Sequence, residues 1–161
     1  MTIPEQSEAV PLDRYERSIL IALQADGRLT NQDLARQVGL SPSACWRRVK
    51  GLEDTGVIQR YTAILDPKKA GIGETVFTHV SLARPSKTSS TKFANLMQEQ
   101  PEVMECFFTT GAADVILRVA TPSVAAYDHF LENVIFNTPS VSRIHSDFAL
   151  RQIKFETALP L

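Results

Sequence analysis

The sequence predicts an α+β protein in two parts, and three observations support this fold class. Short amphipathic helix patterns fill residues 12–54. After Gly56 the apolar residues recur at every second position, which is typical of strands. In residues 72–161 the patterns follow the order strand, helix, strand, strand, helix, strand, which is the ferredoxin-like βαββαβ order.

The composition limits the classes of function. The 161 residues carry a formal charge of −1, so the chain has no overall basic field and any nucleic-acid binding must be local. The opening MTIPEQSEAVP is not typical of a signal peptide, and no apolar run approaches the roughly 20 residues of a membrane span. Cys45 and Cys106 lie far apart, without a CxxC motif or a histidine at metal-ligand spacing. These features predict a cytoplasmic protein with reduced thiols, no metal or other cofactor, and no membrane partner.

The first two helix patterns are bounded by capping residues. LDRYERSILIALQAD begins at an Asp13 N-cap with Glu16 three residues later, and TNQDLARQVG has Thr30 as its cap and Gly39 as its stop. Only a Leu-Ser link separates this stop from the next helix pattern, so we expect a helix-turn-helix motif. The apolar faces comprise Leu12, Tyr15, Ile19, Ala22 and Leu23 in the first helix and Leu34, Ala35 and Val38 in the second.

The third helix pattern, in SPSACWRRVKGLEDTG, divides into an apolar face and a free face. Ser41 is a good N-cap, and Pro42 suits the first helical position. A charged free face is often only solvated, but in a helix-turn-helix motif this helix enters the major groove of DNA. At about 100° per residue, the apolar face carries Cys45, Val49 and Leu52, and the free face carries Ser43, Arg47 and Lys50, with Trp46 at its edge and Arg48 on the other flank.

The free face of this helix predicts contacts to double-stranded DNA. Arg47 can offer a bidentate fork to guanine, and Lys50 suits a phosphate as a point charge. Trp46 either packs on sugars and thymine methyl groups or is partly buried against the first helix; both interpretations stay open. Backbone amides at the N-terminus of the second helix favour phosphate. The predicted DNA contacts are Thr30, Asn31, Gln32, Ser41, Ser43, Trp46, Arg47, Arg48 and Lys50.

The rest of the chain alternates between strand and helix patterns. VIQRYTAIL predicts a strand leaving the first domain, and DPKKAGIG a Pro/Gly turn. We expect a flexible lead-in (1–11), a helix-turn-helix domain (12–57), a strand linker (58–71) and a second domain (72–161). The later elements are the strand ETVFTHVSLA, the helix KFANLMQEQP with Phe93, Leu96 and Met97 inward, the strands EVMECFFTT and VILRVA, the helix SVAAYDHFLENVIF with Val124, Tyr127, Leu131 and Val134 inward, and the final strand VSRIHSDFALRQIKF.

The strand pattern from Glu102 to Thr109 is apolar on both faces. Two helices cover only one face of a βαββαβ sheet, so a strand with two apolar faces implies a covering partner. The simplest partner is a second copy of the chain. With strict alternation, Val103 and Phe107 lie on one face, and Met104, Cys106 and Phe108 on the other.

Taken together, the motifs resemble the Lrp/AsnC (feast/famine) family of transcription regulators over about residues 11–160. The matching segments are LDRYERSIL, DGRLTNQDLA, VGLSPSACWRRVKGLEDTGVIQRY, PEVMECFFTTGAADVILRV and FALRQIKFETALPL. The resemblance implies a winged-helix-like DNA-binding domain, a linker strand that pairs between protomers, and an effector domain that forms homodimers and often octamers. It also implies that an amino acid bound between effector domains modulates sequence-specific DNA binding. SPSACWRR and ETALPL are similar to the branch that senses branched-chain or sulfur amino acids.

The loop GAADV is the candidate effector site by this resemblance. The family often has Gly-x-aromatic-Asp-aromatic here, whereas this chain has Ala113 and Val115 in place of the rings, so the pocket is wider, takes a bulkier ligand or is lost. Loop N–H groups can bind a carboxylate, and Asp114 can accept from an ammonium group or only cap the hairpin. The expected effector contacts are Thr110, Gly111, Ala112, Ala113 and Asp114, with Phe136, Ser146, Asp147, Phe148 and Ala149 on the facing wall by family position.

Two alternative functions are compatible with the sequence. An architectural DNA-compacting protein would bind DNA without responding to amino acids. A sirohaem-decarboxylase-like enzyme would share the two-domain architecture. This chain has no paired carboxylates, no nucleophile with a base and no metal-ligand cluster in its motifs, so we expect no catalytic residues. His79, His129 and His145 are expected to be structural or surface residues.

Overall fold

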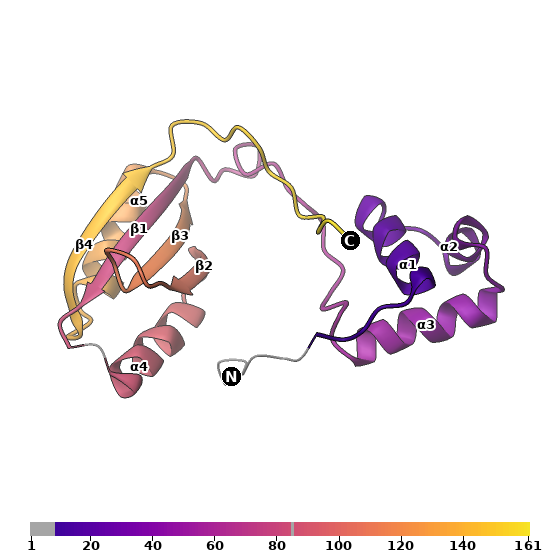
Figure 1. Cartoon of the computed structure of the whole chain (residues 1–161). Coiled ribbons are helices and arrows are strands. Elements are labelled where there is room, and N and C mark those ends of the chain that lie inside the picture. The colour runs from indigo at the N-terminus through magenta and orange to yellow at the C-terminus, as the bar shows by residue number, and fades with distance from the viewer. Residues whose placement is uncertain (1–8, 85) are drawn as a thin grey trace. The chain divides into compact units, whose positions relative to one another are not determined.

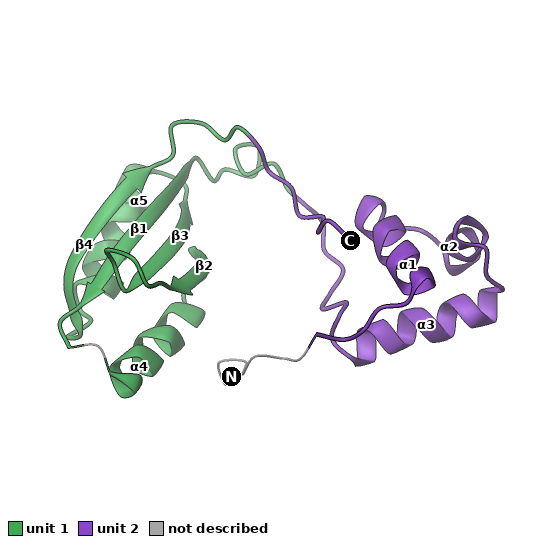
Figure 2. Ribbon diagram, in the orientation of Figure 1, with its two compact units in different colours: residues 1–3, 65–153 green, residues 4–64, 154–161 purple. Residues whose placement is uncertain are grey.

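The structure, a computed structural model, describes residues 9–84 and 86–161. The expected lead-in of residues 1–11 therefore lies mostly outside the described residues. The chain divides into two compact units (Figure 2). The helical unit contains the described residues up to 64 together with 154–161, and the sheet unit contains residues 65–153. No helix within the described ranges is both long enough and apolar enough to cross a membrane.

The helical unit contains α1 (Arg14–Ala25), α2 (Asn31–Val38) and α3 (Pro42–Asp54) (Figure 1). Asp13 and Glu16 form a reciprocal capping box at the start of α1, which confirms the predicted cap. Thr30 and Ser41 cap α2 and α3, and Gly39 ends α2 with φ at 70°, in the left-handed region that glycine adopts without steric cost. The predicted helix-turn-helix motif is confirmed, with a core made of Ile19, Leu20, Ala22, Leu34, Ala35, Cys45 and Leu52.

The sheet unit contains β1 (Glu74–Leu82), α4 (Lys87–Gln98), β2 (Val103–Phe108), β3 (Val115–Thr121), α5 (Val124–Phe130) with its continuation η1 (Leu131–Ile135), and β4 (Val141–Phe148). The strands form one antiparallel sheet in the order β2-β3-β1-β4 (Figure 1). This order confirms the ferredoxin-like arrangement.

The helices cover one face of this sheet. Alternate residues of β1 and β3 are fully buried there, because side chains of a strand point to opposite faces in turn. A buried polar chain joins α5 to two strands: the Tyr127 hydroxyl lies 2.7 Å from Thr78 Oγ1 and 2.6 Å from Ser146 Oγ. The core of this unit comprises Val76, Val80, Leu82, Phe93, Met97, Val115, Leu117, Val119, Tyr127, Phe130 and Ile135.

The other face of the sheet, which we call the open face, is not covered by either helix and mixes apolar and charged side chains. Phe107 lies opposite Ile116, and Phe77 lies opposite Arg118; directly paired residues share a face. Phe107 is 56% exposed and Phe77 is 40% exposed. The predicted second apolar face is therefore present, and two of its large aromatic side chains remain exposed to solvent.

Two predicted strands differ from the structure. Residues 59–66 form no strand, although VIQRYTAIL alternates, because a strand needs a hydrogen-bonded neighbour and this chain offers none there. The final strand ends at Phe148 rather than running on to Phe155. The Ala149 N–H still donates to the Thr75 carbonyl, but β1 starts at Glu74, so the chain beyond has no strand to pair with.

Local geometry explains three further differences. α4 begins at Lys87, earlier than predicted, because Ser86 and Ser89 form a capping box in the segment expected to be a loop. Val124 is exposed in the first turn of α5, while Phe130 and, in the π-helical turn of η1, Ile135 are buried. A register shift near Met104 breaks the strict alternation of β2, so Val103 packs on the helix side together with Cys106.

Candidate DNA-binding interface and effector site

The exposed face of α3 is the candidate nucleic-acid interface. Cys45 is fully buried, whereas Ser43 and Arg47 are exposed, so the predicted division of this helix is present. Trp46 is 60% exposed, so the larger part of its side chain faces solvent. The helix therefore presents a hydroxyl, an indole and a guanidinium on the side opposite its core.

Arg48 differs from Arg47 in its surroundings. Its guanidinium Nη1 lies 2.6 Å from Asp13 Oδ2 and 3.5 Å from Glu16 Oε1, at the start of α1. The guanidinium carbon lies 5.4 Å from the centre of the Tyr15 ring. The hydrogen bond from the Glu16 backbone N–H, together with Arg48, holds the pKa of Asp13 below its usual value. Arg48 was predicted to contact DNA; in the structure its guanidinium pairs with the start of α1 and so links α3 to α1.

Lys50 is also paired, although at the surface. Its ammonium group lies 3.0 Å from Asp54 Oδ1 and 3.7 Å from Glu53 Oε2, and the hydrogen bond and charge of Asp54 raise the pKa of Lys50 above its ordinary value. Exposed pairs of this kind contribute little to stability, so the ammonium group is free to exchange partners. A phosphate would have to compete with two carboxylates for it.

The start of α2 is occupied by interactions within the protein. The Thr30 hydroxyl accepts from the Asp33 N–H and donates to the Asp33 carboxylate at 2.6 Å. The Asn31 side-chain amide donates to the Pro42 carbonyl at 2.9 Å, which ties α2 to α3. Gln32 is exposed. Of the three DNA contacts predicted at the start of α2, Gln32 is therefore the side chain that neither caps α2 nor ties it to α3.

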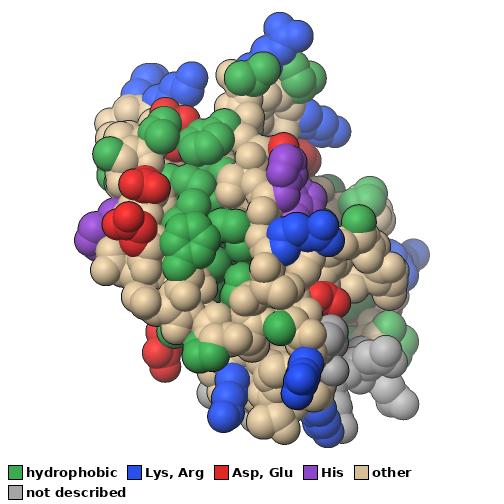
Figure 3. All heavy atoms as spheres, turned by 90° about the vertical axis from the view of Figure 1, so that its left-hand side faces the viewer, with side chains coloured by type: hydrophobic (Ala, Val, Ile, Leu, Met, Phe, Trp, Pro, Cys, Tyr) green, Lys and Arg blue, Asp and Glu red, His purple; other side chains and the backbone are tan. Residues whose placement is uncertain are grey.

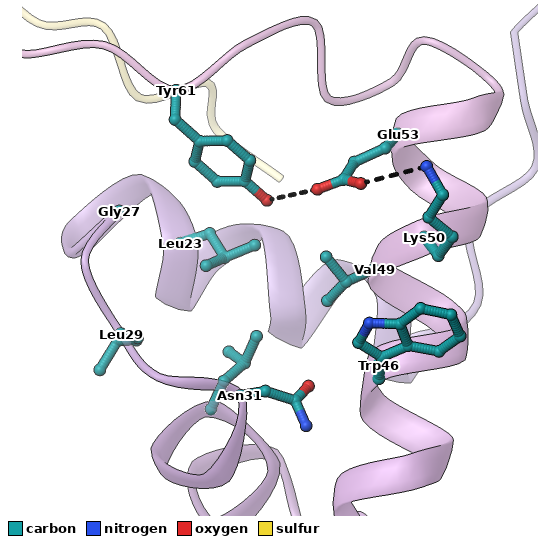
Figure 4. Close-up of a pocket in the computed structure, with 10 residues that line it drawn as sticks. Leu23, Gly27, Leu29, Asn31, Trp46, Val49, Lys50, Glu53 and Tyr61 are labelled. Carbon is teal, nitrogen blue, oxygen red and sulfur yellow. Dashed lines mark hydrogen bonds and ion pairs between the residues drawn. The ribbon is translucent and has the colours of Figure 1, made fainter.

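A groove of about 260 Å³ lies beside Trp46 in the helical unit (Figure 4). The Tyr61 hydroxyl donates to Glu53 Oε1 at 3.2 Å across its upper rim. Burial raises the pKa of Tyr61, and the Glu53 carboxylate adds to the rise. The groove is lined by Leu23, Gly27, Leu29, Asn31, Leu34, Trp46, Val49, Lys50, Glu53 and Tyr61.

The candidate effector loop, residues 109–114, joins β2 to β3 in a tight turn. The Thr109 N–H donates to the Asp114 carbonyl at 2.9 Å, and the Thr109 hydroxyl donates to the Ala113 carbonyl at 2.6 Å. Asp114 Oδ2 accepts from the Leu82 N–H at 2.7 Å, where the β1–β4 register shifts and this N–H faces away from the regular ladder. Asp114 therefore braces the loop against β1 through one carboxylate oxygen.

The other expected effector residues do not join this loop in one chain. Ser146 and Phe148 contact Tyr127 on the helix side, whereas Asp147 lies on the open face. Phe148 pairs with Val76, which is six residues along β1 from Leu82, or about 20 Å at strand spacing. Phe136 is 61% exposed and lines a separate hollow of about 180 Å³ with Val141, Ser142, Arg143 and Ile144.

Some contacts of the helical unit carry no local sequence signal. The Gln24 side-chain amide accepts from the Leu159 N–H at 2.6 Å and donates to the Leu159 carbonyl at 3.1 Å, across 135 positions of sequence. This pair holds the C-terminal segment on α1.

Both cysteines are free, and burial raises the pKa of each thiol. Within residues 9–84 and 86–161, no group of three or more His, Cys, Asp or Glu side chains is arranged to hold a metal ion.

The two units match two known protein families. Residues 12–59 match the winged helix-turn-helix DNA-binding family, and residues 75–159 match the Lrp/AsnC ligand binding domain. A helix-turn-helix unit joined to this domain defines a transcription regulator. The chain belongs to the Lrp/AsnC family of DNA-binding transcriptional regulators, as the sequence predicts.

Several relatives match this chain over both of its units. The Bkd operon transcriptional regulator of Pseudomonas aeruginosa is 42% identical over 93% of this chain and 98% of its own length. The transcriptional activator DecR of Escherichia coli is 36% identical over 93% of this chain and 99% of its own length. A crystal structure of a Neisseria meningitidis regulator in complex with L-Met is 39% identical, covers 93% of this chain and 97% of its own, and superposes with a TM-score of 0.86.

Proposed function

We propose that the outward face of α3 binds the major groove of DNA, with Arg47 contacting a guanine edge. Ser43 contacts a base or phosphate, and Trp46 packs on sugars or thymine methyl groups. The observation that carries this proposal is the division of α3: Cys45 and Leu52 are buried, while Trp46 and Arg47 point away from the core. Lys50 and Gln32 act as phosphate contacts, and Arg48 positions α3 without touching DNA.

Self-association through the open face of the sheet completes the DNA-binding unit. Phe107 and Phe77 are exposed beside Ile116, and a second copy would remove these aromatic rings from water. Two helical units in a homodimer read half-sites about one helical turn apart. We further expect that such dimers can assemble into an octamer, which the family resemblance implies.

An amino acid bound at the β2–β3 loop modulates DNA binding in this proposal. One oxygen of Asp114 is held by the Leu82 N–H, so the carboxylate is fixed in orientation and its second oxygen is available to an ammonium group. The L-Met complex of the Neisseria meningitidis regulator supports an amino acid as the ligand class. Because Ala113 replaces an aromatic ring, we expect a side chain that fills the space beside it, whereas Val115 is fully buried in the core of the sheet unit and leaves no space for a ligand. The facing wall comes from another chain, since Ser146–Ala149 lie too far along β1.

A thermal-shift screen of the twenty amino acids tests the effector proposal. An amino acid that binds the native state raises the apparent stability by about 2.7 kcal/mol at a hundred times its dissociation constant. The hit is then added to DNA titrations, because coupling requires a different affinity for the two states. An amino acid that shifts both curves supports the proposal. DNA binding that responds to none of the twenty would favour an architectural role instead.

A further inference from the structure

Three titratable side chains meet on the open face, where β1 and β4 pair. His79 on β1 lies directly opposite His145 on β4, and their ring centres are 6.2 Å apart. Asp147 follows two residues later on β4, on the same face. Its Oδ2 lies 3.3 Å from His79 Nε2, and its Oδ1 lies 3.1 Å from His145 Nε2. Each imidazole thus faces one oxygen of a single carboxylate.

The surroundings of this cluster offer it little further negative charge. Arg118 on β3 is paired with Glu105 on β2 at 3.0 Å, so these two charges offset one another. Ile116 is the β3 neighbour of His79, and Arg143 lies two residues before His145 on the same face of β4. Figure 3 shows histidine side chains next to acidic and basic ones on the sheet unit. With one shared proton the cluster is neutral, and with two protons it carries a net positive charge beside Arg143.

We infer that the His79–Asp147–His145 cluster makes self-association through the open face sensitive to acid. This inference rests on the proposed function, in which that face is buried against a second copy. One proton is shared favourably between an imidazole and the carboxylate, but a second proton puts an uncompensated charge into the interface. Imidazoles take up protons between about pH 8 and pH 5, so the effect falls within the physiological range.

The sign and steepness follow from proton linkage. The second proton binds the free chain more readily than the buried interface, so association is strongest while each cluster holds one proton and is lost as the pH falls and the second proton binds. If each copy excludes one proton, the association constant of a dimer falls by up to about a hundredfold per pH unit in the acid limb. The cluster would then couple assembly, and with it DNA occupancy, to acidification.

Sedimentation velocity of the full chain between pH 8 and pH 5, with EDTA present, tests the inference. We expect the dissociation constant to rise by about tenfold or more between pH 7.5 and pH 5.5. The double variant His79→Gln and His145→Gln keeps hydrogen-bonding groups at both sites but cannot take up the proton, so it should lose this rise. His129→Gln alters an exposed histidine on α5 and should keep it.

Each outcome decides the question. A wild-type dissociation constant that is flat over this range overturns the inference and leaves the proposed dimer intact. A double variant as acid-sensitive as the wild type overturns it as well, because the protons would then bind elsewhere. A chain that stays monomeric at every pH overturns the proposed self-association, and the inference with it.

Discussion

The two units of the chain place their functional residues in different ways. In the helical unit the candidate DNA contacts lie within one helix and the turn before it, and the caps at Asp13, Thr30 and Ser41 fix their geometry. In the sheet unit the candidate effector residues lie at opposite ends of β1, and the aromatic face is left uncovered. Under the proposed function, the first unit forms its binding surface within one chain, whereas the second is completed by another copy.

The largest expected effect concerns the proposed self-association interface on the open face of the sheet unit. Phe107→Asp would put a carboxylate into the proposed interface, which costs several kcal/mol when the charge is buried without a partner. We expect the dissociation constant for self-association to rise by about a hundredfold or more, measured by light scattering over a dilution series. Val124→Asp makes the same kind of change at an exposed position of α5 and should leave assembly unchanged. Equal assembly of both variants would rule out the open face as the interface.

Two substitutions of Asp114 separate its hydrogen bond to β1 from its proposed role in effector binding. Asp114→Ala leaves the half-buried Leu82 N–H without its acceptor and should lower the free energy of unfolding by about 1–3 kcal/mol, measured with urea. Asp114→Asn keeps an acceptor for this N–H, so the fold should be nearly unchanged while effector affinity falls by about 1.5–3 kcal/mol in calorimetry. Wild-type effector affinity in Asp114→Asn would reduce this residue to a turn brace.

Lys50 tests the electrostatic part of DNA binding. Lys50→Ala should weaken binding to all sequences alike and lower the slope of log affinity against log salt by about one. The loss should be smaller than for Arg47, because Lys50 already interacts with Asp54 and Glu53. Anisotropy titrations at several salt concentrations measure the slope. An unchanged slope would remove Lys50 from the phosphate contacts.

The smallest expected effect concerns Gly111. Its φ is not positive, and a Cβ there would meet no atom within 4 Å, so Gly111→Ala should leave stability within about 0.5 kcal/mol. Gly39→Ala is the matched change at a left-handed position and should cost about 1 kcal/mol. Weaker effector binding in Gly111→Ala would place the ligand against this backbone. A large loss of stability would show that the loop is more constrained than its geometry indicates.

Local patterns predicted the helical unit well because its determinants are local. Caps and a 3.6-residue period lie within a few residues of the helices they define, so the core of α3 and its free face could be assigned. The role of Arg48 could not be assigned, since its partner Asp13 is 35 residues away and both residues lie on surfaces that look solvated in sequence. The Gln24–Leu159 contact is more distant still.

In the sheet unit the strand order followed from the pattern, but its irregularities did not. The register shift near Met104, the π-helical turn of η1 and the early start of α4 all depend on how neighbouring elements pack. The linker and the end of β4 lack a neighbouring strand in one chain, although their residues alternate. The family resemblance supplied the effector residues, and their separation along β1 depends on strand pairing that the sequence does not encode locally.

A comparison of Arg47 with its neighbour Arg48 tests the central claim most directly. Both arginines lie on α3, but Arg47 is exposed while Arg48 pairs with Asp13. Arg47→Ala and Arg48→Ala are titrated by fluorescence anisotropy against a duplex that the wild-type chain selects from a random pool, with melting curves measured alongside. We expect Arg47→Ala to lose about 1–3 kcal/mol of binding and relax the preferred base while its Tm stays unchanged. Arg48→Ala should lower the Tm and retain the base preference. Wild-type DNA affinity in Arg47→Ala, or a lost base preference in Arg48→Ala alone, would contradict the assignment of this face.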